Sequence, residues 1–374
     1  MPETDSDPVA LKESIRNLIL AKGFDAVGFA SPVQPPGYPH YLDWLAQGCH
    51  GEMAYMEKQA EARNHPNSIL PAVGTVIVTL LNYHHGRPSA KVSGEKRNSG
   101  HVASYAQGQD YHRIFWDRLG QVLDQIKVTH PEITGRAVAD SAPLMERDYA
   151  RLAGLGWIGK NTCLINRKIG SFTLLGALLI NLQLPPDEPF EADHCGTCTR
   201  CLDACPTSAL DSAYRLDARK CISYWTIEHK GLLPDEVTDH LNGWVFGCDI
   251  CQDVCPWNRK AILGKDQDLM GDGRFFEPDL REWLKMNPDD LKKQISGTAL
   301  ERTRRRGLVR NAIAVLSSES GDGELMADLI RLETDDTDQI IRESARLAIK
   351  KLQERNHHVS ETGNLDQSNE GGPF

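Results

Sequence analysis

Two closely spaced runs of cysteines constrain the fold of this chain more than any other feature of its sequence. The first run is Cys195-x2-Cys198-x2-Cys201-x3-Cys205, followed by Pro206, and the second is Cys248-x2-Cys251-x3-Cys255, followed by Pro256; Cys221 lies alone between them. These eight of the ten cysteines divide into two sets of four, the number of thiolates that a [4Fe–4S] cluster requires. The spacing therefore predicts a module that holds two iron–sulfur clusters and depends on them to fold.

The position of each cysteine within its run indicates which cluster it binds. In two-cluster ferredoxins the fourth cysteine of such a run binds the other cluster. This rule assigns one cluster to Cys195, Cys198, Cys201 and Cys255, and the other to Cys205, Cys221, Cys248 and Cys251. Structural zinc and disulfides are the alternatives. Zinc more often takes paired Cys-x2-Cys units with histidine, so the triple run and the Cys-Pro ends fit zinc poorly.

The composition indicates a water-soluble protein of two or three domains. The chain has 374 residues, a net charge of −10, and 25% charged and 40% hydrophobic residues, as ordinary globular proteins do. Its longest apolar stretch, residues 172–184, is interrupted by polar residues and is too short to span a bilayer. The acidic residues 1–7 do not resemble a signal peptide, and oxygen-sensitive clusters favour a reducing compartment. We therefore expect a cytoplasmic protein without a membrane span, and we take it to be a monomer.

Hydrophobic periodicity defines a first domain over residues 10–185. Apolar residues follow helical stripes over 11–22 and 111–128, and apolar runs over 25–30 and 75–81 are typical of buried strands. This alternation predicts an α/β domain, within a chain of α+β or α/β class, that is long enough to bury a core of its own. Residues 87–100 are polar, basic and contain glycine, so we expect a mobile loop there.

The remainder of the chain divides into the cluster module, a helical segment and a tail. The ferredoxin-like module is expected over residues 186–262. Residues 277–354 contain amphipathic helical patterns that resemble a HEAT-type repeat, with an aspartate-rich turn as a helix cap. Residues 355–374 are polar and are predicted to be disordered.

Outside the cysteine runs, the densest chemical signal is the stretch 140–162, which reads DSAPLMERDYARLAGLGWIGKNT. Its three late glycines permit close approach of another backbone, and Lys160, Asn161 and Thr162 add hydrogen-bond donors. The stretch matches neither the P-loop nor the Rossmann fingerprint. It predicts either a loop that holds a large polar ligand or an ordinary turn between a helix and a strand.

Asp140 is the candidate acid of this stretch. It precedes a helix predicted over 142–152, and a partly buried carboxyl group there would have a raised pKa and could donate a proton near pH 7. A helix cap or a surface aspartate is the alternative. His112 is predicted to be a packed or surface histidine, and Cys49 and Cys163 small buried hydrophobes.

Several motifs together resemble one enzyme family. They are Ser104-Tyr105-Ala106, Asp110-Tyr111-His112, Asp140-Ser141-Ala142-Pro143, Glu146-Arg147, the glycine-rich sequence that ends at Thr162, both cysteine runs, CISYWTIE at 221–228 and FGCDICQDVCPWN at 246–258. Over roughly residues 10–350 the chain resembles the epoxyqueuosine reductases, which complete queuosine synthesis on transfer RNA. The tail after residue 354 carries no such signal.

The resemblance implies cofactors, a partner and site residues that spacing alone does not. It implies a cobalamin in the first domain, held without the Asp-x-His-x-x-Gly motif, and electron flow from an external flavodoxin- or ferredoxin-type donor through two clusters to cobalamin. It implies reductive removal of the epoxide oxygen of epoxyqueuosine at the wobble position of transfer RNA, with Asp140 as proton donor. The candidate cobalamin contacts are Arg63, Tyr105, Asp140, Asn161 and Ser171.

A basic patch lies where a transfer RNA partner would need it. The sequence ERTRRRGLVR at 301–310 has a local charge of +4 in an acidic chain, and its arginines are Arg302, Arg304, Arg305, Arg306 and Arg310. Phosphate contacts of this kind supply sequence-independent affinity. A solvated helix face is the alternative, and residues 87–97 are a second candidate for holding RNA.

Two other functional classes fit parts of the pattern. A pure electron-transfer ferredoxin would explain the clusters but would not need the first domain or its glycine-rich stretch. Another corrinoid reductase, such as a reductive dehalogenase, would share the clusters and the cobalamin but typically carries a twin-arginine export signal, which this sequence lacks.

Overall fold

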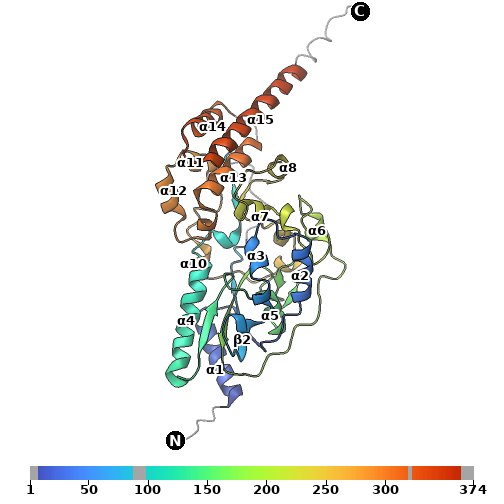
Figure 1. Ribbon diagram of the computed structural model, residues 1–374, viewed down its shortest axis with the longest axis vertical. Coiled ribbons are helices and arrows are strands. Elements are labelled where there is room, and N and C mark those ends of the chain that lie inside the picture. Colours follow the sequence, from blue (N-terminus) through green and yellow to red (C-terminus); the bar gives the residue numbers. More distant parts are fainter. Residues whose placement is uncertain (1–6, 87–97, 319–321, 364–374) are drawn as a thin grey trace, which may run out of the picture.

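The chain forms an elongated molecule with a β-sheet at one end and a helical region at the other (Figure 1). The computed structural model describes residues 7–86, 98–318 and 322–363. None of the helices in these ranges is long and apolar enough to cross a membrane. The predicted loop at 87–100 lies almost wholly outside the described residues.

A four-stranded antiparallel sheet forms the centre of the first domain. Its order is β1 (Ala26–Ala30), β2 (Thr75–Asn82), β7 (Thr173–Ile180) and β4 (Gly135–Val138). Strands β2 and β7 pair along their whole length, from Thr75 opposite Ile180 to Asn82 opposite Thr173. Every neighbouring pair is antiparallel, so the domain is α+β, and the α/β alternative with parallel strands is wrong.

Helices cover both faces of this sheet, which explains why every residue of β2 is buried. On one face, α1 (Pro8–Ala21) and α4 (Tyr111–Thr129) pack their apolar stripes against the sheet. On the other face lies α5 (Glu146–Leu152), with Tyr149 and Ala150 in the core. The stripes predicted for α1 and α4 are confirmed, whereas α5 begins four residues later than the predicted 142.

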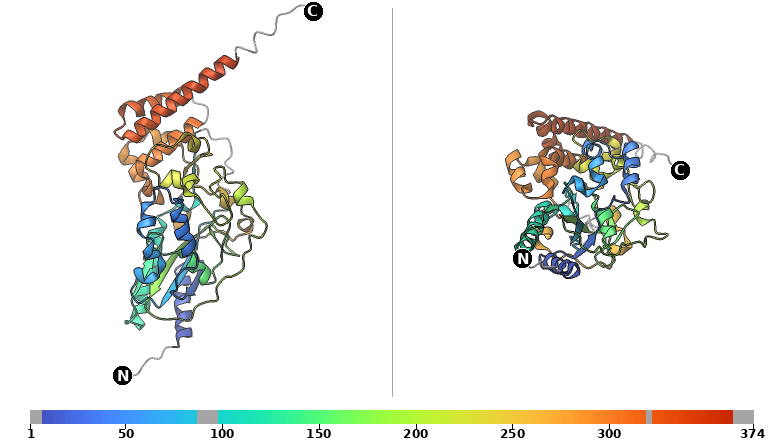
Figure 2. Two further views of the ribbon diagram at one scale, coloured as in Figure 1. Left: turned by 45° about the vertical axis from the view of Figure 1, so that its right-hand side comes forward. Right: turned by 60° about the horizontal axis from the view of Figure 1, so that its bottom comes forward.

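Short elements complete this domain and bring its loops to the end that faces the cluster module (Figure 2). They are α2 (Tyr38–Ala46), α3 (Ala54–Lys58), β5 (Trp157–Ile158), β6 (Leu164–Ile165) and the 3-10 turns Glu61–Asn64, Pro66–Ser68 and Ser104–Ala106. The late glycines of the 140–162 stretch serve close packing of protein on protein. A Cβ at Gly156 would lie 2.2 Å from the carbonyl oxygen of Ile165, so the turn from α5 into β5 requires glycine there.

The cluster module consists of short helices and turns around the cysteines. They are α6 (Arg200–Asp203), α7 (Ile222–Ile227), α8 (Asp235–Thr238), α9 (Ile250–Asp253) and the 3-10 turns Ala218–Lys220 and Pro256–Asn258. Its strand β8 (Trp244–Phe246) pairs in parallel with β3 (His101–Val102) of the first domain. The two segments are therefore joined by backbone hydrogen bonds as well as by side chains.

The C-terminal region is helical and shares one core with the cluster module. It contains α10 (Gln267–Met270), α11 (Leu280–Lys285), α12 (Pro288–Ile295), the 3-10 turn Ala299–Arg302, α13 (Arg304–Ser318), α14 (Gly323–Asp335) and α15 (Gln339–Gly363). Helix α13 is buried over residues 307–317 and packs between α11, α15 and β8. Residues of β8, α7, α13, α14 and α15 form a single apolar cluster.

The end of the last helix differs from the sequence-based expectation, whereas its start agrees. Helix α15 continues to Gly363, so the tail predicted over 355–374 begins with helix; residues 364–374 lie outside the described part of the chain. The predicted cap at the start of α15 is confirmed, because Oδ1 of Asp338 accepts a hydrogen bond of 2.9 Å from the backbone N–H of Ile340.

Candidate active site and cluster sites

The four cysteines predicted for the first cluster line one pocket. Cys195, Cys198, Cys201 and Cys255 surround a space of about 130 Å³, although Cys255 belongs to the other run. Burial raises the pKa of the Cys255 thiol to about 11, and the sulfurs of Cys195 and Cys201 contribute to this shift. This proximity supports the crossed assignment for one set of four.

The other four cysteines also lie together. Burial raises the pKa of the Cys248 thiol, and the sulfurs of Cys221 and Cys205 raise it further. The thiol of Cys251 has a raised pKa as well, first because of a hydrogen bond with Cys163 and then because of burial, with Cys248 and Cys221 contributing. All ten cysteines are free thiols. In the described ranges, no group of three or more His, Cys, Asp or Glu side chains is arranged to hold a single metal ion.

The glycine-rich stretch holds the cluster module in place. The ammonium group of Lys160 donates to the carbonyl oxygens of Gly196 and Cys198 at 2.6 and 3.0 Å. The side-chain amide of Asn161 donates to the carbonyl oxygen of Cys251 at 3.4 Å and accepts from the backbone N–H of Cys163 at 3.3 Å. Two of the three donors that the sequence predicts for a ligand are thus engaged by the backbone around the clusters.

Ser171 is part of a buried polar network between the sheet and the second cysteine run. Its hydroxyl donates to Oε1 of Gln252 at 3.1 Å and accepts from Nδ2 of Asn258 at 3.0 Å. Its backbone N–H donates to Oδ1 of Asn258 at 2.7 Å, and Gln252 reaches the hydroxyl of Tyr83 at 3.3 Å. These groups satisfy the hydroxyl of Ser171 within the protein, and its contact with cobalamin stays a prediction.

Asp140 lies directly after β4 in a backbone conformation that few residues adopt. Its φ is +52°, in the left-handed region, where aspartate and asparagine are the commonest residues after glycine. Helix α5 starts only at Glu146, with Met145 as its cap residue, so Asp140 is not a helix cap. Strained conformations of this kind concentrate at functional sites. The strain turns the carboxyl group toward two residues at the start of α4.

Tyr111 and His112 are these two residues. The hydroxyl of Tyr111 donates to Oδ2 of Asp140 at 2.9 Å, and Nε2 of His112 lies 3.5 Å from the same oxygen. On the far side of the imidazole ring, Nδ1 of His112 lies 2.7 Å from Oδ1 of Asp110. Asp110 is also the cap of α4, since it accepts a hydrogen bond from the backbone N–H of His112. The helix start therefore fixes the geometry of all three side chains.

The charge state of Asp140 is the opposite of the sequence-based expectation. The hydrogen bond with His112 lowers the pKa of Asp140, and Tyr111 and Arg147 lower it further, against the effect of burial. Burial by itself would lower the pKa of His112, but its hydrogen bonds with Asp110 and Asp140 raise that pKa to about 9. The predicted raised pKa of Asp140 is therefore wrong for the free protein, because the expectation did not include a cationic partner.

Buried polar atoms without partners surround this site. Arg63 is 9% exposed. Its guanidinium makes two weak contacts, one to the carbonyl oxygen of Leu144 at 3.5 Å and one to the sulfur of Met56 at 3.7 Å, and lies 5.8 Å from the ring centre of Tyr41. Nε of Arg63 and Oε1 of Glu146 have no hydrogen-bond partner among the described residues. Burial raises the pKa of Glu146 to about 8, with Asp140 contributing. A donor and an acceptor are thus both available to a ligand.

Aromatic side chains complete the surroundings of Asp140. Burial raises the pKa of Tyr55 to about 12, and both Glu228 and Asp140 contribute to this shift. Burial also raises the pKa of Tyr105, with the charge of Asp140 as the next cause. The ring of Tyr105 lies edge-on to that of Tyr111, with 6.0 Å between the ring centres. Tyr105 therefore lies beside Asp140.

The arginine patch reaches this site through Arg302. Its guanidinium lies 5.6 Å from the ring centre of Tyr55 and pairs with Glu228 at 3.0 Å. Asp140 is among the charges that raise the pKa of Arg302, after the hydrogen bond with Glu228. Although Arg302 is distant from Asp140 in the sequence, the fold brings the patch and the candidate acid into electrostatic contact.

The other arginines of the patch divide into exposed and structural groups. Arg302, Arg304, Arg305 and Arg306 line an open depression of about 670 Å³ together with Lys230. Arg306 is half exposed, with Asp338 at 2.7 Å, whereas Arg305 pairs with the buried carboxylate of Asp336. Arg305 therefore contributes to the packing of the helices as well as to the charge of the depression.

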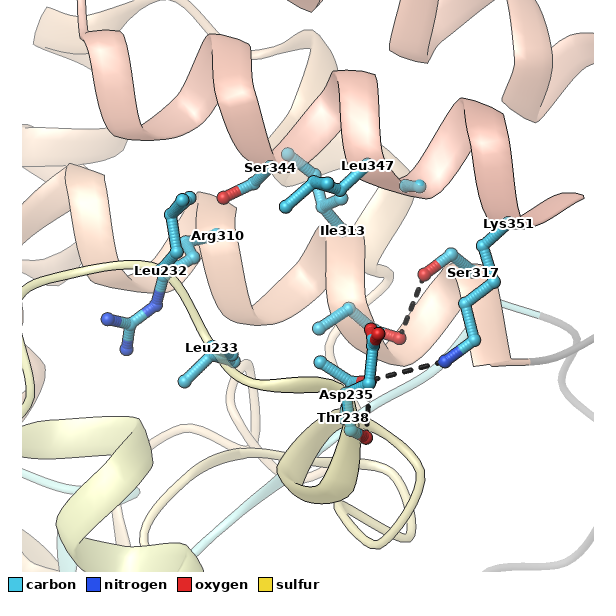
Figure 3. A pocket seen from close by; sticks show the side chains of 12 residues that line it. Leu232, Leu233, Asp235, Thr238, Arg310, Ile313, Ser317, Ser344, Leu347 and Lys351 are labelled. Carbon is cyan, nitrogen blue, oxygen red and sulfur yellow. Dashed lines mark hydrogen bonds between the residues drawn. The ribbon is translucent and has the colours of Figure 1, made fainter.

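Arg310 is buried, so its predicted contact with RNA is wrong. It is 1% exposed, and its guanidinium donates to the carbonyl oxygens of Trp225, His229 and Gly231 at 2.7–2.9 Å. In Figure 3 it lies with Leu232 on the wall of a small pocket between α13, α15 and the segment before α8. The arginine joins the helical region to the cluster module.

Sequence reasoning missed two partners of the site. It assigned His112 to packing or to the surface, and it gave Glu146 no defined role. The available signal for His112 was its position two residues after Asp110, an Asp-x-His spacing at a helix start. Cys163, predicted to be a small hydrophobe, hydrogen-bonds with Cys251 beside the second set of cysteines.

Two family models match this chain. One is described as a 4Fe-4S double cluster binding domain and matches residues 194–258, which include all eight predicted ligands. The other is described as epoxyqueuosine reductase QueG, DUF1730, and matches residues 63–141, which include Arg63, Tyr105, His112 and Asp140.

Curated proteins resemble the chain over most of its length. The epoxyqueuosine reductase of Cyclobacterium marinum is 41% identical over 290 residues, which are 77% of this chain and 91% of the relative. That of Xanthomonas campestris is 35% identical over 346 residues, 92% of this chain and 96% of the relative. That of Escherichia coli is 34% identical over 319 residues, 85% of this chain and 84% of the relative.

Solved structures resemble the whole described fold. A crystal structure of epoxyqueuosine reductase with an epoxyqueuosine-modified tRNA-Tyr stem loop superimposes with a TM-score of 0.84 at 29% identity, over 91% of this chain and 90% of that chain. The structure of epoxyqueuosine reductase from Streptococcus thermophilus gives a TM-score of 0.80 at 28% identity, over 91% and 90% of the two chains.

Proposed function

Because this chain belongs to the epoxyqueuosine reductase family, we propose that it converts epoxyqueuosine in transfer RNA to queuosine by reductive removal of the epoxide oxygen. The observation that carries the proposal is the joint presence of family identity over most of the chain, two sets of four cysteines and the Asp140 site. A pure electron carrier would need only the cysteines. The separate site around Asp140, with its strained backbone and acidic side chain, fits an enzyme.

The two sets of cysteines hold two [4Fe–4S] clusters, which supply one-electron transfer when bound. Cys195, Cys198, Cys201 and Cys255 hold one, and Cys205, Cys221, Cys248 and Cys251 hold the other. Lys160 and Asn161 anchor both runs to the catalytic domain, and this anchoring fixes the distance over which electrons pass. An external flavodoxin- or ferredoxin-type donor supplies the electrons.

The side chains around Asp140 fit a cobalamin. The corrin ring bears amide groups, which need both donors and acceptors, and the unpartnered Nε of Arg63 and Oε1 of Glu146 provide one of each in a buried setting. Tyr105 adds an aromatic wall beside Asp140. When bound, cobalamin supplies a metal centre that delivers electrons to the epoxide carbon. Asn161 stays a candidate contact of cobalamin only through side-chain atoms that are not already bonded to Cys251.

Asp140 donates a proton to the departing epoxide oxygen. Its side chain is 69% exposed to solvent, yet many protein atoms lie around it. Both hold for a side chain on the wall of a recess. Tyr111 orients the carboxyl group by donating a hydrogen bond to Oδ2. Positioned acids of this kind contribute about 10²- to 10⁴-fold to a rate.

Arginines of the helical region hold the transfer RNA. Arg302, Arg304 and Arg306 are exposed around the depression of about 670 Å³ and lie beside the Asp140 site, which is the arrangement a modified base with flanking phosphates requires. Helices α13–α15 form a HEAT-like module that presents these side chains. We place the protein in the cytoplasm, as a monomer.

The proposal is tested by composition and by product. Protein purified without oxygen should contain iron for two clusters and should bind one corrinoid, visible in its absorption spectrum. With a chemical reductant it should convert epoxyqueuosine to queuosine in transfer RNA, as read by mass analysis of the nucleosides. Iron without corrinoid binding and without conversion would instead identify an electron carrier.

A further inference from the structure

The balance of the proposed reaction requires more protons than one carboxyl group holds. Both carbon–oxygen bonds of the epoxide break, a carbon–carbon double bond forms, and the oxygen leaves as water. Two electrons from the flavodoxin- or ferredoxin-type donor and two protons are consumed in each turnover. Asp140 carries at most one proton at a time, so a second group must supply or replace it.

His112 is placed to do this. Its Nε2 lies 3.5 Å from Oδ2 of Asp140, and its Nδ1 lies 2.7 Å from Oδ1 of Asp110. The longer distance is at the edge of hydrogen bonding, and catalytic hydrogen bonds are commonly long in free enzymes and tighten in the complex. The ring also stacks on Tyr111, with centres 4.1 Å apart, which fixes its plane.

The charged groups around this pair determine where the proton resides. His112 faces the carboxylates of Asp110 and Asp140, and Arg113 is a further charge near Asp110. Asp140 faces His112, Tyr111 and Arg147, and its charge also acts on Glu146, Tyr55, Tyr105 and Arg302. Two carboxylates on one imidazole favour its doubly protonated form, so in the free protein the proton resides on His112 and Asp140 is ionised.

His112 is also connected to bulk water. Its side chain is 24% exposed, and its ring contacts that of Trp116, with centres 5.9 Å apart. Trp116, whose ring contacts that of His112, and Ser141, which follows Asp140 in the chain, line an open depression of about 260 Å³. Water that reaches the exposed part of the imidazole can reload it between proton transfers.

We propose that His112 is the proton reservoir of Asp140: Nε2 of the imidazolium gives its proton to the ionised carboxylate of Asp140 at Oδ2, the carboxyl group so formed protonates the epoxide oxygen, and Asp110 holds the ring for reloading. The inference rests on the proposed role of Asp140. His112 is a positioning and proton-supplying residue, since it acts on the substrate through Asp140. Tyr111 orients Asp140 and keeps its own proton, because burial raises its pKa well above the usual value.

The first test compares His112→Gln with His130→Gln in the holoenzyme. His130 lies at the other end of the same helix and pairs with a single carboxylate, Glu132, at 3.5 Å, so it is a matched control. Turnover of an epoxyqueuosine-containing stem loop is measured with reduced methyl viologen from pH 6 to 10. We expect His112→Gln to lower kcat by about 10- to 100-fold with KM within about twofold, whereas His130→Gln leaves both unchanged.

The pH profile separates proton supply from mere packing. The native rate should decline as pH rises through about 9, where the imidazole loses its proton, and this decline should be absent in His112→Gln. Asp110→Asn keeps the helix cap but removes one carboxylate, so the decline should move to lower pH by about one unit. Added imidazole should restore part of the activity of His112→Ala in proportion to its protonated fraction.

A readout without turnover uses the imidazole itself. In ring carbon–proton NMR spectra of the cofactor-free protein, the signal lost in His112→Gln should titrate near pH 9 and should shift to lower pH in Asp140→Asn. Native kcat and an unchanged alkaline decline in His112→Gln would overturn the reservoir while leaving the role of Asp140 intact. Full activity of Asp140→Asn would overturn both the reservoir and the role of Asp140. Loss of iron or corrinoid binding in a variant would identify a folding defect. In that case the NMR titration of the native protein still tests whether an imidazole titrates near pH 9.

Discussion

The buried polar network beside the second cysteine run and the surroundings of Asp140 differ in how far the protein satisfies its own polar groups. Next to the second run, Ser171, Gln252, Asn258 and Tyr83 bond to one another and no unpartnered atom is found among them. Around Asp140, Arg63 and Glu146 each bury an atom without a partner. The network beside the second run is satisfied by protein groups alone and fixes the distance between the sheet and the cysteines, as electron transfer requires. The buried atoms of Arg63 and Glu146 lack protein partners and are available to a large polar cofactor.

The largest effects are expected from changes to the cysteines of the two runs. Cys255→Ala should remove up to four iron atoms from the set that contains Cys195, and Cys205→Ala should do so for the set that contains Cys248; both should abolish turnover. Iron analysis and electron paramagnetic resonance should show the other cluster intact. Cys49→Ala, buried outside both sets, is the control and should keep all iron. If Cys255→Ala disturbed the Cys248 set instead, the crossed assignment would be wrong.

Asp140→Asn should leave the cysteine sites intact and still lower turnover by roughly 100-fold or more, because the amide cannot donate the proton. Iron content and corrinoid binding should remain those of the native protein. Asp124→Asn, an exposed position on α4, is the matched control and should be neutral. Turnover of Asp140→Asn near the native value at pH 7 would remove Asp140 from the mechanism.

Arg63→Gln tests whether the unpartnered side-chain nitrogen of Arg63 binds the corrinoid. Loss of a charged hydrogen-bond donor should weaken corrinoid binding about 10- to 100-fold, following the roughly 1.5–3 kcal/mol of such a bond. Titration of the cofactor-free protein with cobalamin measures the affinity, and iron content serves as the control. An unchanged affinity would mean that Arg63 is only a structural cation over Tyr41, whose ring centre lies 5.8 Å away.

The RNA contact is tested with the exposed arginines only. Arg305 is left unchanged, since its pair with the buried Asp336 stabilises the helices. Arg304→Glu with Arg306→Glu should reduce the log–log salt slope of stem-loop binding by about two units, the effect of two lost phosphate contacts. Arg346→Glu, on α15 and paired with Glu343, is the control. An unchanged slope would assign RNA binding to another surface, such as residues 87–97.

The smallest effect concerns stability and Glu146. Because its pKa is raised from 4.5 to about 8 in the folded protein, the folded state binds more protons than the unfolded state between these values, and stability falls as pH rises through that window. Glu146→Gln removes this loss. The cofactor-free variant should therefore melt a few degrees above the native protein at pH 8 and show little difference at pH 4.5. Equal melting temperatures at pH 8 would show that Glu146 is ionised there at no cost.

The same comparison explains what the sequence could predict. Cysteine spacing is a local property of the sequence, so the prediction of eight ligands in two sets of four could be made from the runs alone. The stripes of α1 and α4 are equally local. The antiparallel order of the sheet and the partners of Asp140 depend on contacts between distant residues, and His112 is joined to Asp140 only when α4 packs beside β4. Arg310 was wrongly assigned to RNA binding because the charge of the run gives no information on burial. Helix α13, which contains Arg310, is buried along most of its length.

The position of α13 links RNA binding to the iron supply. Its Arg310 bonds to the carbonyl oxygens of Trp225, His229 and Gly231, and its Asn311 to those of Thr226 and Val245, at 2.7–2.9 Å. These acceptors lie within ten residues of Cys221 or Cys248 in the chain. A chain that lacks its second cluster should therefore also lose the arrangement of its arginine surface. With the arginines in the proposed role, such chains would not hold epoxyqueuosine-containing transfer RNA in inactive complexes under iron starvation, and this substrate would stay available to the loaded enzyme.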